Sequence, residues 1–305
     1  MTWHKILTYS GLVLFLFFTC SVVDYSVTKS EMEYEFPYDF KDALSMSLPK
    51  SLKEISGLTF DDKTNRIYCV EDENGVVYTL DRNTGKIVVK NKFFSKGDYE
   101  GICLTKNSLF ILNSRGILYK LPRDNFSAEP VVINCFNNVK IDLEGLAYDK
   151  KSNSLLIACK GFITDDLNAT RTIYRYDIKK EKVVNEPYLR VSKNEFKSFM
   201  TENYSLKEAS KMFKKTFDED KEQMHFGPSA IAIHPKTRNT YVLSSQGSCV
   251  IIYKGKTNKI LHVEKLSKKL FEQPEGICFE PNGNMYISSE GKKHSGKLVF
   301  IPAKI

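Results

Sequence analysis

Residues 142–148 read Asp-Leu-Glu-Gly-Leu-Ala-Tyr, and the part of this stretch from Glu144 onward has four related copies along the chain. Each copy has a small or acidic residue, then Gly or Ala, then a run rich in apolar residues. The five copies lie at 56–60, 100–104, 144–148, 229–233 and 275–279. Their starts are 44, 44, 85 and 46 residues apart, so the long step is one repeat plus an insert of about 40 residues.

The same order of short apolar segments follows each copy. A second strand is predicted at 66–70, 108–112, 154–158, 240–244 and 285–288, and a third at 76–80, 117–121, 172–176, 249–253 and 297–301. Units one to four continue with a more polar fourth strand at 86–89, 130–133, 182–184 and 260–263. Four short antiparallel strands per repeat are typical of a β-propeller blade. We therefore predict an all-β fold, a five-bladed β-propeller.

The fifth unit reaches the end of the chain after three strands, which leaves one strand edge without a partner. The segment 38–48, Tyr-Asp-Phe-Lys-Asp-Ala-Leu-Ser-Met-Ser-Leu, precedes the first repeat and belongs to none of the five units. An exposed edge strand is a liability that folds avoid. We therefore expect this N-terminal segment to pair with the last blade and close the ring.

The insert, Val191 to about Gln223, departs from the strand pattern. Ser192-Lys-Asn-Glu and Ser205-Leu-Lys-Glu both fit the capping box, in which a hydroxyl and a carboxylate reciprocally satisfy free amides at a helix start. Apolar residues recur at helical spacing behind the second box. This pattern predicts two short amphipathic helices whose apolar side packs on the blades, within a propeller domain of residues 38–305.

The first twenty residues resemble a lipoprotein-type signal peptide. A short polar start precedes the apolar run 11–18 and then Thr19-Cys20, and this run is too short to cross a bilayer. Phe17-Phe18-Thr19-Cys20 resembles a lipobox, although Phe17 replaces the usual Leu and Thr19 is larger than the Gly, Ala or Ser preferred before the cysteine. We predict lipidation at Cys20 and a tether over 21–37; an ordinary secretory peptide or an uncleaved anchor is the alternative.

The composition places the chain among globular proteins. Hydrophobic residues make up 42% and charged residues 27% of its 305 residues, which excludes wholesale disorder, collagen-like and polytopic membrane classes. The net charge of +8 is spread along the chain without a block of like charges, so no nucleic-acid partner is predicted. The cysteines after Cys20 lie mainly in apolar strands and lack zinc-finger spacing, which favours buried thiols over disulfides or metal ligands.

The five motif regions, taken together and after such a leader, resemble the SdiA-regulated family of bacterial envelope proteins. They read Lys-Glu-Ile-Ser-Gly-Leu, Asp-Tyr-Glu-Gly-Ile, Asp-Leu-Glu-Gly-Leu-Ala, Gly-Pro-Ser-Ala-Ile and Gln-Pro-Glu-Gly-Ile, at 53–58, 98–102, 142–147, 227–231 and 273–277. The similarity extends over about residues 38–305 apart from the insert. It implies a five-bladed propeller distantly similar to NHL-repeat proteins, with a calcium site but no established activity.

The motif also predicts a ring of polar side chains. The innermost strands of a propeller line its central channel, so equivalent positions surround the axis, namely Ser56, Glu100, Glu144, Ser229 and Glu275. Three carboxylates brought together repel unless a cation or basic side chains neutralise them. Calcium held by Glu100, Glu144 and Glu275 is one interpretation. The other is that these glutamates accept backbone amide bonds from a neighbouring blade or pair with Arg115 or Lys160.

Two functions follow from this pattern. The leading hypothesis is a non-enzymatic lipoprotein of the bacterial cell envelope, held at the membrane by its lipid, whose propeller offers its loops to a protein or glycan partner. The alternative is a calcium-dependent hydrolase of phosphoesters or lactones, in which the three glutamates hold the ion and His225 or a ring carboxylate activates water. For His225, a surface role between insert and blade is the simpler interpretation.

Overall fold

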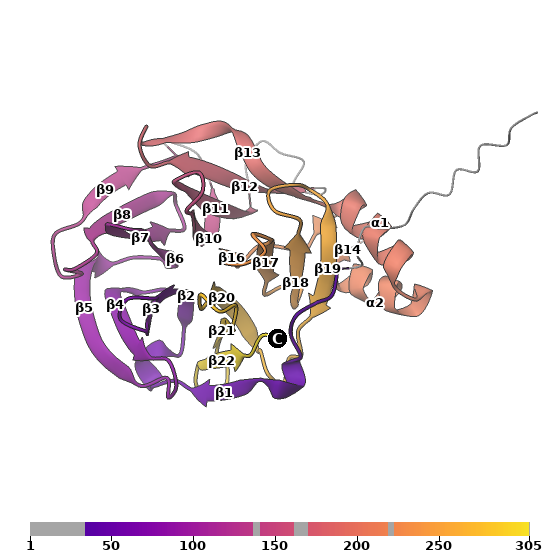
Figure 1. The fold of residues 1–305 in the computed structure, drawn as a ribbon, viewed down its shortest axis with the longest axis horizontal. Helices are drawn as coiled ribbons and strands as arrows, with labels where there is room; N and C mark the ends of the chain where they lie inside the picture. Colours follow the sequence, from indigo (N-terminus) through magenta and orange to yellow (C-terminus); the bar gives the residue numbers. More distant parts are fainter. Residues whose placement is uncertain (1–33, 137–140, 162–169, 219–222, 305) are drawn as a thin grey trace, which may run out of the picture. The chain divides into compact units, whose positions relative to one another are not determined.

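Five four-stranded antiparallel sheets surround a central axis (Figure 1). The structure is a computed structural model and describes residues 34–136, 141–161, 170–218 and 223–304. The innermost strands of successive sheets contact one another in a closed cycle, from β2 through β6, β10, β16 and β20 back to β2. The prediction of a five-bladed β-propeller is therefore confirmed. Cys20 and the predicted signal peptide lie outside the described residues, as does most of the predicted tether.

The first three blades follow the chain in order, from the innermost to the outermost strand. Blade one consists of β2 (Ile55–Asp61), β3 (Arg66–Glu71), β4 (Asn74–Asp81) and β5 (Ile87–Lys96). Blade two consists of β6 (Tyr99–Leu104), β7 (Ser108–Asn113), β8 (Ile117–Pro122) and β9 (Val131–Asn134). Blade three consists of β10 (Asp142–Asp149), β11 (Ser154–Gly161), β12 (Thr170–Asp177) and β13 (Lys182–Ser192).

The last two blades use the same order, and the fifth borrows its outer strand. Blade four consists of β16 (Ala230–Ile233), β17 (Thr240–Ser244), β18 (Cys249–Tyr253) and β19 (Ile260–Lys265). Blade five consists of β20 (Gln273–Phe279), β21 (Met285–Glu290), β22 (Lys297–Ile301) and the N-terminal strand β1 (Leu44–Ser47). Short 3₁₀ turns flank β1 at Phe40–Asp42 and Lys50–Leu52.

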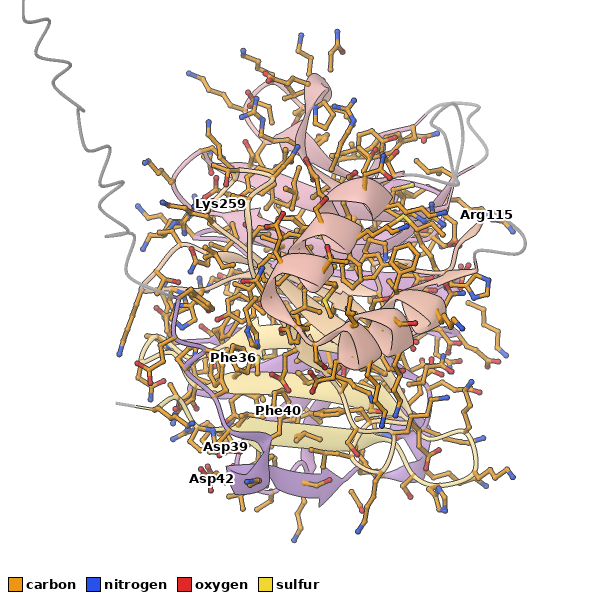
Figure 2. The ribbon with its side chains drawn as sticks, turned by 90° about the vertical axis from the view of Figure 1, so that its right-hand side faces the viewer. Phe36, Asp39, Phe40, Asp42, Arg115 and Lys259 are labelled. Atoms are coloured by element: carbon orange, nitrogen blue, oxygen red, sulfur yellow. The ribbon has the colours of Figure 1, made fainter. Side chains whose placement is uncertain are left out.

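The N-terminal segment closes the ring, as the unpaired edge of the fifth unit predicted. β1 pairs antiparallel with β22, with Leu44 opposite Phe300. Tyr38 is 3% exposed, forms a bridge with Ala303, and its hydroxyl donates to the carbonyl of Gly283 at 2.7 Å. These contacts place the segment at the end of the channel where β22 finishes and the β20–β21 turn lies. In Figure 2, Phe36 and Asp39 lie toward this end and Arg115 toward the other.

The hydrophobic core lies between adjacent blades. Buried side chains of each sheet pack against those of the next, as Tyr68 of β3 does against Ile102 of β6 and Leu112 of β7 against Leu146 of β10. The cysteines of this region are free thiols, and all except the half-buried Cys135 are buried. Neighbouring sheets therefore stabilise each other by apolar burial, which explains why every blade must have a partner on both sides.

The insert forms two helices, α1 (Lys193–Asn203) and α2 (Leu206–Thr216), followed by a short hairpin of β14 (Phe217–Asp218) and β15 (Gln223–Met224). The hydroxyl and carboxylate of Ser205 and Glu208 exchange hydrogen bonds with each other's amides, as the capping box predicted. The buried faces of both helices join the core between blades three and four through Phe196, Met200, Ala209, Met212 and Phe213. No helix of the described chain is both long and apolar enough to span a membrane.

Candidate functional site

The glycine of the repeated motif allows the innermost strands to approach each other closely. A Cβ atom on Gly57 would lie 2.8 Å from the amide nitrogen of Ile102 in the next blade. A Cβ atom on Gly101 would lie 2.6 Å from the Cβ of Leu146. Both distances are shorter than real Cβ contacts, so any larger residue would push two blades apart. In these blades the Gly of the motif therefore permits the close contact between innermost strands, whereas blade four has Ala230 at the equivalent position.

The residue before this glycine is the additional residue of a β-bulge. The strand pairing shifts between Tyr99 and Gly101, between Leu143 and Gly145, and between Pro274 and Gly276. In each case the glutamate of the motif has no partner in the second strand. Because a bulge redirects the side chain of its extra residue, the three glutamates face the axis. Sequence reasoning predicted the ring but missed the bulges that build it.

The structure brings Glu100, Glu144 and Glu275 together around a narrow space that Ser229 also lines. This space measures about 10 Å³, enough for about one water molecule. Ser56, the ring residue of blade one, is 1% exposed and its hydroxyl has no hydrogen-bond partner among the described residues. At the level of the ring the channel is therefore closed to anything larger than a small ion or a water molecule.

Lys160, at the end of β11, supplies positive charge to this ring. Its ammonium group forms an ion pair with the carboxylate of Glu144, and the two side chains are 33% and 7% exposed. The sequence offered this pair as the alternative to a metal. Asp142 also acts on Lys160, and the net effect of its carboxylate neighbours is to raise the lysine's pKa although burial lowers it. Lys160 is therefore a permanent counter-ion of the ring.

One ammonium group does not neutralise the ring, and the carboxyl pKa values reflect this. Burial, and then the charge of Glu144, raises the pKa of Glu100 to about 10. Burial, and then the charge of Glu275, raises the pKa of Glu144 to about 8 although Lys160 opposes this. Burial, and then the charge of Glu290, raises the pKa of Glu275 to about 7. Near neutral pH, the carboxyl groups that Lys160 does not neutralise are therefore largely neutralised by bound protons.

These side chains, as placed, do not form a calcium centre. Within the described residues no group of three or more His, Cys, Asp or Glu side chains is arranged to hold a metal ion. The carboxylate of Glu144 is bonded to Lys160, whereas calcium takes six to eight oxygen ligands. Calcium at Glu100, Glu144 and Glu275 stays a prediction from the sequence, and we derive no chemistry from it.

A second acidic group, in the β3–β4 turn of blade one, lies at the same end of the channel. Glu71 is 4% exposed and accepts hydrogen bonds from the amides of Glu73 and Asn74. Burial, and then the charge of Glu54, raises the pKa of Asp72 to about 6. Burial, and then the charge of Asp72, raises the pKa of Glu290 in blade five to about 7. These carboxyl groups extend the acidic surroundings of the ring outward.

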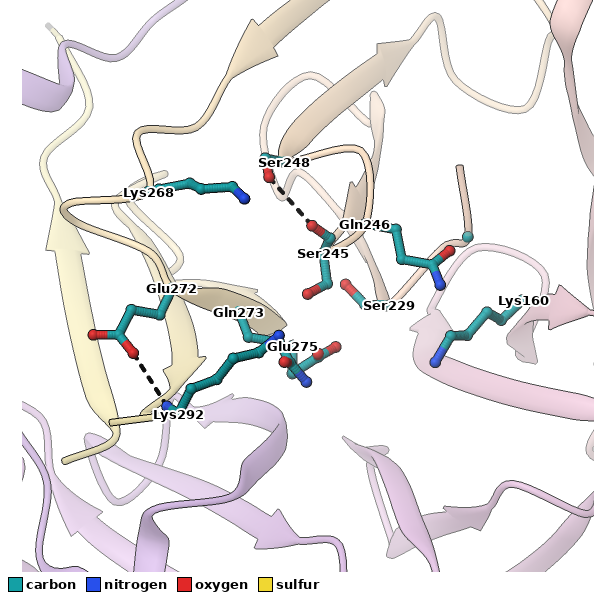
Figure 3. Close-up of a pocket in the computed structure, with 11 residues that line it drawn as sticks. Lys160, Ser229, Ser245, Gln246, Ser248, Lys268, Glu272, Gln273, Glu275 and Lys292 are labelled. Carbon is teal, nitrogen blue, oxygen red and sulfur yellow. Dashed lines mark hydrogen bonds between the residues drawn. The ribbon is translucent and has the colours of Figure 1, made fainter. Parts of the chain in front are cut away.

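Above the ring the channel opens into a hollow of about 300 Å³, which we call the mouth hollow (Figure 3). It lies between blades three, four and five, and its polar floor includes Ser229 and Glu275. Its walls come from loops and strand ends and include Lys160, Gln246, Lys268, Gln273 and Lys292. Most of these residues lie outside the repeated motif, in the connections between strands.

His225, the candidate base, is exposed between β15 and β16. It lines neither the ring nor the mouth hollow. The structure therefore brings the three predicted glutamates together and leaves this histidine out of their immediate surroundings.

Comparisons with known proteins agree with this architecture. Among solved structures, the chain is similar to glutaminyl cyclase of Myxococcus xanthus, with 12% identity, a TM-score of 0.53, and coverage of 86% of this chain and 96% of that chain. It is similar to the WD40 repeats of RRP9, with 9% identity, a TM-score of 0.51, and coverage of 88% and 99%. At these identities the likeness shows the fold alone.

The sequence comparisons show the family. A search of curated proteins found no match to this chain. A family model described as SdiA-regulated matches residues 36–161 and 188–293, which include all five motif regions and most of every blade. The gap between the two matched parts covers β12 and the first part of β13, which form the outer half of blade three. The chain therefore belongs to the SdiA-regulated family, as its five motifs indicated.

Proposed function

We propose that this protein is a non-enzymatic binding module of the bacterial cell envelope, held at the membrane by a lipid on Cys20. The observation that supports a role without catalysis is that hydroxyl groups in the ring and next to it bond to the backbone of the neighbouring blade. The hydroxyl of Ser229 donates to the carbonyl of Pro274 at 2.8 Å, and that of Ser288 to the carbonyl of Ser56 at 2.9 Å. A catalytic nucleophile needs a base within hydrogen-bond reach. These hydroxyl groups instead join neighbouring blades.

The position of the N-terminal segment gives the proposed module an orientation. Tyr38 lies at the end of the channel opposite the mouth hollow, where it forms a bridge with Ala303, and Phe36 stacks on His262 of β19 with ring centroids 4.3 Å apart. A lipid anchor before this segment would leave the mouth end directed away from the membrane. A protein or glycan partner would meet the loops of that end.

The anchor is tested in a bacterial host by replacing one residue. Cys20→Ser removes the only thiol that the lipobox-like sequence offers. We expect the natural protein to incorporate radiolabelled palmitate and to sediment with membranes, and the variant to do neither. A Thr19→Ser variant keeps the thiol and should retain both properties. Equal palmitate labelling of Cys20→Ser and the natural protein would refute the anchor.

The binding role is tested against hydrolysis with one panel of substrates. Generic ester, lactone and phosphoester substrates are incubated with the purified domain, with calcium and separately with EDTA. We expect no turnover above a heat-denatured control in either condition. Calcium-dependent turnover that is lost in Glu144→Gln, with the variant still folded by circular dichroism, would replace this proposal with the hydrolase hypothesis.

A further inference from the structure

Three lysine side chains from three separate parts of the propeller converge on the mouth hollow. Lys160 follows β11 in blade three, Lys268 lies between β19 and β20, and Lys292 lies between β21 and β22. In Figure 3, Lys160 and Lys268 extend toward the hollow from opposite sides, and Lys292 runs toward Glu275. Lys160 is already paired with Glu144, but Lys268 and Lys292 bring further positive charge to the same space, and like charges there repel unless an anion lies between them.

The nearby carboxylates do not pair with Lys268 or Lys292, although the charge of Lys292 acts on Glu290 and lowers its pKa against the larger effect of burial. Glu272 forms an ion pair with His294 and accepts a hydrogen bond from the backbone amide of Lys292 at 3.1 Å. Burial raises the pKa of Glu275 to about 7, although hydrogen bonding from Gln273 and Ser245 opposes this, so its carboxyl group is largely uncharged below that pH. Neither Lys268 nor Lys292 takes part in an ion pair with another described residue.

The remaining surroundings of the hollow suit a small polar molecule. Ser229 and Ser248 are 2% and 4% exposed and lie at its buried side, and the amide of Gln246 stands at its wall. A volume of about 300 Å³ is at the small end of the range for ligand pockets. Such a hollow holds a molecule of the size of one sugar unit and excludes a folded chain.

We propose that the mouth hollow binds a small hydroxylated anion, whose carboxylate or phosphate group lies between Lys268, Lys292 and Lys160 and whose hydroxyl groups meet Gln246 and the serine side chains. Ammonium groups on flexible stems accept either anion, so the shared chemistry is an anionic oxygen group on a polyol. This inference concerns a small ligand and does not depend on the lipid anchor or on the macromolecular partner proposed above.

The test is isothermal titration calorimetry of the purified propeller domain with gluconate, glucose 6-phosphate, inorganic phosphate and sorbitol at low salt. We expect gluconate, glucose 6-phosphate or both to bind, and sorbitol, which has no charge, not to bind. The carboxylate and phosphate probes distinguish the two sources of anionic charge. Binding of inorganic phosphate alone, of sorbitol as tightly as the anions, or of no probe would overturn the proposal.

The site is located with matched variants. Lys268→Gln and Lys292→Gln change exposed side chains, so both should fold, which the melting temperature checks. Each loses a charge-assisted hydrogen bond, so we expect the affinity to fall about tenfold in either variant. Lys304→Gln removes an exposed lysine at the opposite end of the channel and should leave the affinity unchanged. Unaltered affinity in the Lys268→Gln, Lys292→Gln double variant would show that the anion binds elsewhere.

Discussion

Replacing Glu100 with glutamine is expected to stabilise the protein in mildly alkaline solution. The folded chain holds a proton on this carboxyl group because burial and neighbouring carboxylates raise its pKa from 4.5 to about 10. The unfolded chain releases that proton above pH 4.5. A group whose pKa is raised by folding contributes stability below its unfolded pKa, and the contribution is lost as the pH rises toward the folded value. Glutamine is uncharged in both states and carries no such cost.

The size of the effect follows from the distance between the two pKa values. Each pH unit above 4.5 costs about 1.4 kcal/mol, which sets an upper bound of about 5 kcal/mol at pH 8. Glu100 is partly exposed and shares its charge with Glu144 and Glu275, so we expect about 2 kcal/mol. For a domain of this size that corresponds to a melting temperature about 5 °C higher.

The assay is thermal and urea denaturation of both proteins at pH 5 and pH 8, with EDTA present. The free energy of unfolding of Glu100→Gln should be close to that of the natural protein at pH 5 and higher than it at pH 8. Glu129→Gln changes an exposed glutamate before β9 and should alter stability by less than about 0.5 kcal/mol at either pH. A Glu100→Gln protein that is less stable at pH 8 would refute the reasoning, because it would mean that an ionised carboxylate is needed there.

Three further substitutions test the contacts that hold the propeller together, and denaturation measures the effect of each one. Lys160→Met removes the partner of Glu144, whose pKa is about 8, and should cost about 1 kcal/mol at pH 9 and less at pH 5.5, where that carboxyl group holds a proton; an equal loss at both pH values would contradict the pairing. Gly57→Ala brings a Cβ to within 2.8 Å of the next blade and should cost about 1–3 kcal/mol, whereas the control Gly161→Ala has 3.8 Å of room and should be near neutral. Tyr38→Ala empties the buried closure site and should cost about 3 kcal/mol; a neutral result would mean that the N-terminal segment does not close the last blade.

The repeat carries most of the information that determines this fold. Equivalent positions in successive units predicted the order of strands in every blade, and the shortage of one strand in the fifth unit predicted that residues 38–48 would complete it. The same equivalence brought Glu100, Glu144 and Glu275 to one axis. These features could be predicted because they depend on spacing along the chain, and spacing is constant from unit to unit.

Features that depend on a single side chain or loop could not be predicted in this way. Leu206 belongs to the apolar residues that recur at helical spacing behind the second capping box, but it is the first residue of α2 and is 82% exposed. Lys268 and Lys292 come from connections that differ in length between units, so no periodicity marks them as neighbours. The pairing of Lys160 with Glu144 depends on side-chain geometry at the channel. The sequence offered it only as one alternative to a metal.

The ring and the mouth hollow are adjacent, so the proposed anion should be coupled to the protons of the ring. An anion beside Lys160 adds negative charge near Glu144 and Glu275, whose pKa values are about 8 and about 7. Like charge favours the uncharged form of a carboxyl group. Binding should therefore raise both pKa values and take up part of a proton at pH 7.5.

Titration with gluconate in two buffers of different ionisation enthalpy, such as Hepes and Tris, measures this uptake as a difference in apparent binding enthalpy. The same apparent binding enthalpy in both buffers would place the anion away from the ring, because an anion beside Lys160 must alter the protonation of Glu144 and Glu275.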